Sequence, residues 1–211
     1  DQSPSRRVIN FKDWPLDRVS APDGYRGPVA ADYPDCLEIV ERLVKPERDK
    51  LWKGDATARD RARRWWQFAR QTMSLYRTIA PLKRVMVIAI GATKYPYFSL
   101  SKEKIVFSHA LGVIALDAKA CHALLNSDFH VMWAWKNAST MRGDMRYTPS
   151  AIFETFPLPP GLEPSSQGKS SDSFRLLDEL GEHLHEGRRA LMTALDIGLT
   201  SLYNLYHAPD L

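Results

Sequence analysis

The spacing of hydrophobic residues changes twice along this chain, and each change predicts a different kind of secondary structure. Residues 35–44 place apolar side chains three and four positions apart and precede Pro46, which predicts a helix. From Thr57 to Tyr76 the same spacing predicts a second, longer helix. Between residues 82 and 116 the apolar positions form short β-branched runs, which indicate strands.

The strand-like runs are short and are separated by turn residues, so they predict a small antiparallel sheet. The predicted strands are Val85–Ile90, Tyr95–Leu100, Ile105–Ser108 and Leu111–Ala115. Helical spacing returns after this region. One helix is predicted to run to Leu125 with Asp117 as its N-cap, and another follows Asn126.

The two ends of the chain differ from this middle part. Residues 1–31 are rich in proline and glycine and are interpreted as a connecting arm, with one short strand around Val8–Phe11. Residues 161–173 contain five serines and are interpreted as a linker. Residues 174–195 carry a leucine stripe that predicts a long helix, followed by a shorter one over 199–206. The expected fold class is α+β, a small antiparallel sheet flanked by helices, followed by the start of a C-terminal helical region.

Composition fits a globular protein and adds little to the fold prediction. The chain has 211 residues with 44% hydrophobic and 26% charged side chains, which allows one domain or one domain with an appendage. No apolar run approaches the roughly 20 residues that span a bilayer, so no membrane partner is expected. Cys36 and Cys121 are isolated thiols, which suits a reducing cytoplasm. Because the first residue is Asp1 and not methionine, an excised piece of a larger protein is expected.

Charge is distributed unevenly along the chain. The net charge is +4, yet residues 77–150 hold ten basic against four acidic residues, and residues 151–211 hold four against nine. A polyanion such as nucleic acid would therefore be attracted to the middle of the chain.

The stretch from Ser139 to Pro159 contains the most specific chemistry in this basic segment. Arg142, Asp144 and Arg146 alternate with Gly143 and Met145, so an extended backbone would point all three charges the same way. A guanidinium beside a carboxylate is suited to hydrogen-bonding with base edges in a DNA groove. The alternative is a surface loop with an ordinary Arg–Asp ion pair. The apolar run that follows, through Phe156, is expected to enter a core and to end at Pro157.

Other basic and polar residues are candidates for contacts to DNA phosphates. Arg63, Arg70 and Arg77 recur every seventh residue along the longer predicted helix, either as a solvated face or as a phosphate-tracking stripe. Three lysines sit at the predicted sheet turns, and two hydroxyl residues precede the Arg142 segment. These secondary candidates are Lys94, Lys102, Lys104, Ser139 and Thr140.

No catalytic constellation is visible in the sequence. It contains no G-x-G-x-x-G dinucleotide motif, no phosphate-binding P-loop, no nucleophile elbow and no H-E-x-x-H motif. The Asn/Asp-Pro-Pro-Tyr motif of N6-adenine methyltransferases is also missing. His122 and His130 are separated by a predicted helix break, so they are not interpreted as a metal pair. We therefore expect a non-catalytic chain without a metal site.

Several segments resemble, in the same order, the target recognition domains of MmeI-like (type IIL) restriction–modification enzymes and their BREX-type methyltransferase relatives. The runs Arg142-Gly-Asp-Met-Arg-Tyr-Thr-Pro-Ser and Phe153-Glu-Thr-Phe-Pro-Leu-Pro resemble the end of such a domain. The other segments that resemble the family are Val8-Ile-Asn-Phe, Tyr33-Pro-Asp-Cys, Val44-Lys-Pro-Glu-Arg, Trp65-Trp, Leu75-Tyr, Asn126-Ser-Asp-Phe-His-Val-Met-Trp and Gly198-Leu-Thr-Ser-Leu-Tyr-Asn.

The resemblance implies a division of the chain and a role for each part. Residues 1–31 would connect to an absent methyltransferase domain, residues 32–160 would form the target recognition domain, and residues 161–173 would link it to a helical region over 174–211. The implied function is sequence-specific recognition of double-stranded DNA within a bacterial phage-defence enzyme. S-adenosylmethionine would bind the absent methyltransferase domain of the same parent chain and not this segment.

The resemblance also implies which residues read the bases. The family's specificity-determining pair falls at Arg142 and Asp144, and Arg146 matches an arginine beside that pair. Arginine would donate to guanine, and the carboxylate would accept from the amino group of the paired cytosine. The alternative function is a protein-interaction or scaffold module of a larger complex. Salt dependence of binding separates the two, because DNA affinity falls steeply with added salt.

Overall fold

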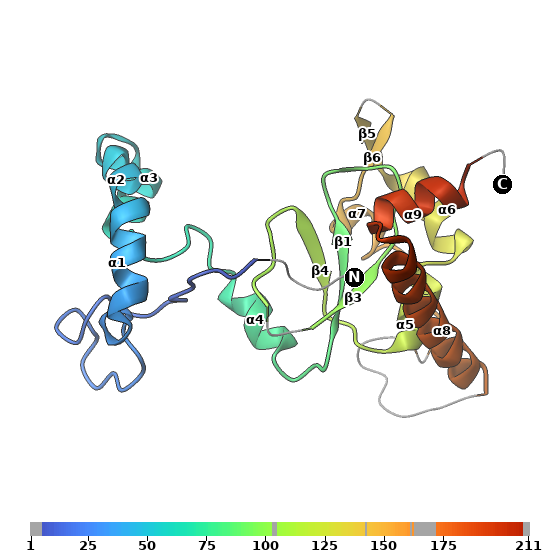
Figure 1. Ribbon diagram of the computed structural model, residues 1–211, viewed down its shortest axis with the longest axis horizontal. Helices are drawn as coiled ribbons and strands as arrows, with labels where there is room; N and C mark the ends of the chain where they lie inside the picture. The colour runs from blue at the N-terminus through green and yellow to red at the C-terminus, as the bar shows by residue number, and fades with distance from the viewer. Residues whose placement is uncertain (1–5, 103–104, 142, 161, 163–171, 209–211) are drawn as a thin grey trace. The chain divides into compact units, whose positions relative to one another are not determined.

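The computed structural model describes residues 6–102, 105–141, 143–160, 162 and 172–208. These residues belong to two units, Arg6–Arg77 and Thr78–Leu211 (Figure 1). Each unit has its own buried cluster of apolar side chains. The described residues form helices and two small antiparallel sheets, which confirms the predicted α+β class. No described helix is long and apolar enough to cross a membrane.

The Arg6–Arg77 unit is helical in its described part. It contains the 3₁₀-helices η1 (Ala30–Asp32) and η2 (Lys50–Lys53) and the α-helices α1 (Pro34–Leu43), α2 (Lys45–Asp49) and α3 (Ala56–Arg63). Its core is formed by Phe11, Ala30, Val40 and Trp65, which are all buried. The predicted strand around Val8–Phe11 is therefore wrong. This segment has no strand pairing among the described residues, and Phe11 instead fills the core beside α1.

The predicted helix from Thr57 to Tyr76 is also wrong, because the chain turns in its middle. Helix α3 ends at Arg63, and α4 (Met73–Ile79) begins after Thr72, whose φ is +43°. Between them the indole of Trp66 and the amide of Gln67 both donate to the carbonyl oxygen of Trp14, at 2.9 and 2.8 Å. These bonds hold the segment against the N-terminal residues, in place of continued helix.

The break changes the interpretation of the arginine stripe. Arg63 lies at the end of α3, Arg70 lies in the irregular segment, and Arg77 lies in α4. They therefore do not share one helix face, although Arg63 and Arg70 are both exposed.

Helix α3 begins with a side-chain cap that gives a testable stability effect. The Asp55 carboxylate accepts the Ala58 backbone N–H at 2.7 Å. Asp55→Ala should lower the free energy of unfolding of this unit by about 1 kcal/mol, whereas Asp55→Ser should cost only a few tenths. Urea unfolding followed by circular dichroism measures both. Equal stability of Asp55→Ala and the unchanged protein would contradict the role of the cap.

The predicted single sheet is two three-stranded sheets in the Thr78–Leu211 unit. In the first, β1 (Val85–Ala89) lies between β3 (Ser99–Ser101) and β4 (Leu111–Ile114). In the second, β6 (Asp144–Arg146) lies between β2 (Ala92–Thr93) and β5 (Ser139–Met141). Neighbouring strands are antiparallel throughout. Residues 105–108, which were predicted to form a strand, have no strand pairing in the described structure.

Helices cover these sheets and include α5 (Lys119–Leu125), α6 (Asp128–Asn137), α7 (Pro149–Ile152), α8 (Asp172–Leu195) and α9 (Leu199–Tyr206). Helix α8 runs alongside α5 (Figure 1). Ala118, not the predicted Asp117, is the N-cap of α5, and its side chain makes no capping bond. The carboxylate of Asp178 from α8 instead accepts the Ala120 N–H at 3.0 Å. A backbone N–H group in the first turn of α5 thus finds its hydrogen-bond acceptor on the neighbouring helix.

The apolar run after the Arg142 segment enters the core as predicted. Ile152 is fully buried, and Phe153 and Phe156 pack against the same cluster. Most of the predicted linker over 161–173 lies outside the described residues. Of its described members, Leu162 is buried in this core, and Asp172 and Ser173 already belong to α8.

Candidate functional site

Strands β5 and β6 form a hairpin, and this hairpin contains the Arg142 segment. Met141 pairs with Asp144, Thr140 with Met145, and Ser139 with Arg146. The connection therefore has two residues, of which Gly143 has a φ of +88° and Arg142 lies outside the described residues. A φ in this range favours glycine because it has no Cβ. The predicted extended run is confirmed from Asp144 to Arg146, which form β6.

The strand separates its charged residues from its apolar one. Met145 is fully buried, so its neighbours Asp144 and Arg146 project from the opposite face of the strand. Asp144 is half-buried and Arg146 is exposed. Within the described part of the chain, neither side chain makes a hydrogen bond or an ion pair.

Pairing on both sides holds β6 in place. Its Arg146 pairs with Ala92 and its Met145 with Thr93 on β2, while β5 pairs along the other side. Cross-strand pairing directs Ser139 and Ala92 to the same side as Arg146. The two charged residues of β6 thus lie on a strand that is paired along both of its sides.

Directly after β6, Tyr147 anchors the hairpin in the core. Its ring is 1% exposed and lies edge-to-face against Phe98, with ring centroids 5.6 Å apart. Its hydroxyl lies 3.1 Å from Nε2 of His130 on α6. Burial lowers the pKa of His130 to about 4 and raises the pKa of Tyr147. At neutral pH the Tyr147 hydroxyl and the His130 imidazole are therefore both uncharged. Such a hydrogen-bonded pair can be buried beneath the hairpin without the cost of burying a charge.

His122 and His130 occupy separate structural positions. Nδ1 of His122 lies 3.3 Å from the Gly181 carbonyl, and its Nε2 lies 3.2 Å from the Phe98 carbonyl. Among the described residues, no group of three or more histidines, cysteines or acidic side chains is placed to hold a metal.

The remaining predicted contact residues are scattered. Ser139 and Thr140 are exposed on β5, close to Arg146. Lys94 follows β2, and its ammonium donates to the Asn204 side chain at 3.0 Å and lies over the Tyr95 ring. Lys102 is exposed beyond β3, and Lys104 lies outside the described residues. Arg63 and Arg70 belong to the other unit.

Sequence reasoning missed the residues that position the hairpin. The pairing of β2 with β6 joins residues more than 50 positions apart through two pairs only, and no pattern in the sequence indicates it. The partnership of Tyr147 with His130 was likewise not predicted. Both residues stand in the motifs that carry the family resemblance, which was the available signal.

Comparison with known proteins identifies a family and a similar fold. Residues 30–160 match the family described as the target recognition domain of MmeI. The fold is similar to a structure of the type IIL restriction–modification enzyme MmeI in complex with DNA, with a TM-score of 0.58 and 14% sequence identity. That similarity covers 78% of this chain and 20% of the MmeI chain. No match was found among curated proteins.

The matched residues make up more than half of the chain and include the hairpin and its support. The protein is therefore a target recognition module. It belongs to the MmeI target recognition domain family.

Proposed function

We propose that this chain recognises double-stranded DNA by inserting the β5–β6 hairpin into the major groove. The observation that supports this most is the pair of side chains, Asp144 and Arg146, that project from β6 opposite the buried Met145 and have no partner in the described chain. A two-stranded ribbon fits the major groove, where the base pairs can be told apart by their donors and acceptors.

The chemistry of the hairpin favours a G·C pair. The guanidinium of Arg146 can donate two hydrogen bonds to O6 and N7 of guanine, and the Asp144 carboxylate can accept from N4 of cytosine. Arg142, the other predicted base-reading residue, lies outside the described residues and stays part of the proposal. Because β6 is paired on both sides, these groups are presented with little freedom of the backbone.

Contacts to phosphates would add affinity and set the register on the duplex. Ser139 and Thr140 stand beside the reading face and are the nearest candidates. Arg63, Arg70, Lys94, Lys102 and Lys104 remain proposed secondary contacts. Lys94 would first have to release Asn204.

The chain spans about a fifth of the MmeI chain that it resembles. We propose that its parent is a cytoplasmic N6-adenine methyltransferase of a restriction–modification system. The methyltransferase domain, with its S-adenosylmethionine, would lie outside this segment and would act on the DNA that the hairpin reads.

A protein-interaction role is the second candidate, and one observation favours it. Phe129 and Met132 on α6 are 79% and 71% exposed, which is unusual for apolar side chains on one helix face. Binding measured at 50 and 200 mM salt separates the two roles. Affinity for DNA should fall by about 100-fold or more, and affinity for a protein partner by much less.

Base reading can be tested by selecting bound sequences from a random duplex library. Arg146→Gln should reduce the preference at one base position by about 10- to 100-fold, because one bidentate contact is worth about 1–3 kcal/mol. Exchanging Arg142 and Asp144 for Glu and Arg should change which base is preferred. Arg189→Gln, which removes the same charge from α8, is the matched control and should leave the preferred sequence unchanged. An unchanged preference in both hairpin variants would refute the proposal.

A further inference from the structure

Arg188 is a buried cation outside the family-matched residues. It lies on α8 and is 6% exposed. No carboxylate among the described residues pairs with it. Its guanidinium instead donates to the Phe98 carbonyl oxygen at 2.7 Å and to the Asn126 side-chain oxygen at 2.8 Å. An unpaired buried charge is costly to a fold, so its place here needs a reason.

Both acceptors of Arg188 belong to a cluster that supports the hairpin. The Phe98 carbonyl also lies 3.2 Å from Nε2 of His122, and the Asn126 side-chain oxygen also accepts the Phe98 N–H at 2.9 Å. The Phe98 ring packs edge-to-face on Tyr147 and His130, the pair that anchors β6. Arg188 thus fixes the backbone of the residue whose side chain supports the end of the reading strand.

A second path runs from Arg188 to the hairpin through stacked rings, here called the aromatic stack (Tyr95, Tyr97, Tyr203 and His207). The guanidinium carbon lies 5.2 Å from the ring centre of Tyr203 and 5.7 Å from that of Tyr97. These two rings are stacked at 3.9 Å, and Tyr95 is stacked on His207 at 5.0 Å. Cations favour such ring faces, more strongly when they are desolvated.

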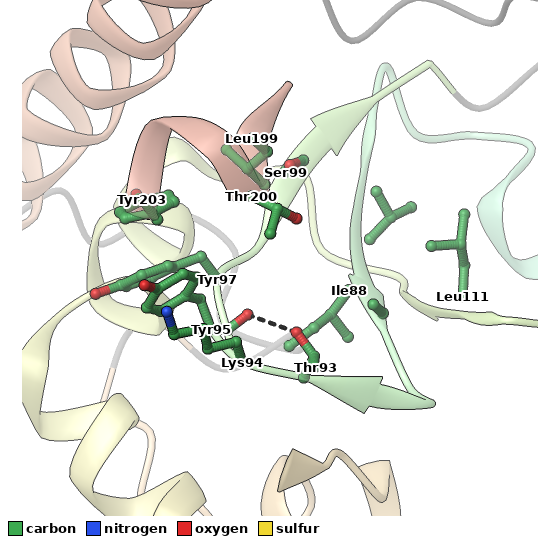
Figure 2. A pocket seen from close by; sticks show the side chains of 12 residues that line it. Ile88, Thr93, Lys94, Tyr95, Tyr97, Ser99, Leu111, Leu199, Thr200 and Tyr203 are labelled. Carbon is green, nitrogen blue, oxygen red and sulfur yellow. Dashed lines mark hydrogen bonds between the residues drawn. The ribbon is translucent and has the colours of Figure 1, made fainter. Parts of the chain in front are cut away.

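The aromatic stack joins α9 to the segment that continues β2. Figure 2 shows Tyr203, Thr200 and Leu199 of α9 beside Tyr95 and Tyr97. These residues line a cavity of about 180 Å³. The Thr93 hydroxyl donates to the Tyr95 carbonyl at 2.9 Å, so the turn between β2 and the stack is fixed as well. Strand β2 then pairs directly with β6. Both paths from Arg188 therefore end at the strand that carries Asp144 and Arg146.

We infer that Arg188, together with the aromatic stack, positions β6 for base reading and thereby contributes to DNA specificity. Arg188 is a positioning residue and touches no base in this proposal. The recognition module would then extend beyond residue 160 to the end of α9. This inference rests on the proposed function of the hairpin.

Native-state hydrogen exchange tests the positioning separately from DNA binding. In Arg188→Met, the amides of β2 and β6 should exchange at least about tenfold faster than in a control of equal overall stability. Ile114→Ala is that control, since Ile114 lies on β4 of the other sheet and its truncation opens a cavity in the same core without removing a partner of Arg188. Arg188→Lys keeps the positive charge but lacks the planar guanidinium group that donates to two acceptors at once. It should therefore restore only part of the protection of the β2 and β6 amides against exchange.

A second pair of variants covers the case in which Arg188→Met does not fold. Tyr203→Leu removes a ring from the aromatic stack, whereas Tyr203→Phe keeps it. Faster exchange in β2 and β6 is expected for Tyr203→Leu and not for Tyr203→Phe. Equal exchange in these strands for Tyr203→Leu and Ile114→Ala would overturn the inference.

The selection experiment then connects positioning with specificity. Arg188→Met or Tyr203→Leu should reduce discrimination between the preferred sequence and a one-base mismatch by about tenfold, while binding to unrelated DNA at low salt stays within about twofold. Unchanged discrimination would overturn the inference while the proposed function stands. If the unchanged protein shows no sequence preference at all, the proposed function is overturned. The specificity role of Arg188 then falls with it, even if the amides of β2 and β6 exchange faster in the variants.

Discussion

Gly181→Ala is expected to cost about 3 kcal/mol or more of folding free energy in the Thr78–Leu211 unit, at the upper end for overpacked positions. A Cβ at this position would lie 1.9 Å from the Lys119 carbonyl oxygen and 2.6 Å from its carbonyl carbon. Both atoms belong to the backbone of α5, so no side-chain rotation relieves the clash. The first turn of α5 is also bonded to α8 through Asp178 and Ala120, which limits any shift of the two helices.

The same helix supplies the matched control. Gly187 has open space where a Cβ would be, and it is exposed. Gly187→Ala should stabilise the unit by about 0.5–1 kcal/mol, because alanine favours helix over glycine. Urea unfolding followed by circular dichroism measures both variants. If the two substitutions change stability equally, the close approach of α8 to α5 is wrong.

Acidification from pH 7 to pH 5 is expected to lower the free energy of unfolding by about 4 kcal/mol. Burial lowers the pKa of both His122 and His130 to about 4, so the folded state keeps them neutral. The unfolded chain takes up these protons near pH 6.5 and is favoured below that pH. Their stabilisation is present above pH 6.5 and is lost as pH falls towards 4, at about 2 kcal/mol per histidine by pH 5.

The neighbours of His122 act in the same direction. The Arg188 charge lowers its pKa further, and the pKa of the nearby His185 is also lowered, mainly by burial. Unfolding in urea at pH 7 and pH 5 tests the effect, and His130→Gln should remove about half of it. The exposed His109 is the control, since His109→Gln should leave the difference unchanged. A stability that does not change between these pH values would show that the two histidines are accessible to protons.

Local sequence patterns correctly predicted the elements whose secondary structure is determined by residues close to one another in the sequence. The helical spacing before Pro46 gave α1, and the β-branched run gave β1, each within a residue or two of its observed limits. The alternation around Met145 correctly placed Asp144 and Arg146 on the same side of an extended segment. In these cases the periodicity of the sequence and the burial of the element agree.

The failed predictions depend on contacts between distant residues. The helix after Thr57 breaks because Trp66 and Gln67 bond to Trp14, about 50 positions earlier. The sheet splits in two because β2 pairs with β6 and not with its neighbours in sequence. Arg188 falls between Leu184 and Leu191 on the leucine stripe, but only the fold shows that ring faces and a carbonyl oxygen surround it.

The alternation along β6 has a practical consequence for engineering. Positions 144 and 146 point away from the core, while Met145 and Tyr147 fill it, so the outward pair can be varied in a combinatorial library with little loss of folded protein. The same library applied to positions 145 and 147 should yield mostly insoluble clones. On the proposed function, randomising alternate codons of this short strand would be a direct search for variants with a changed target sequence.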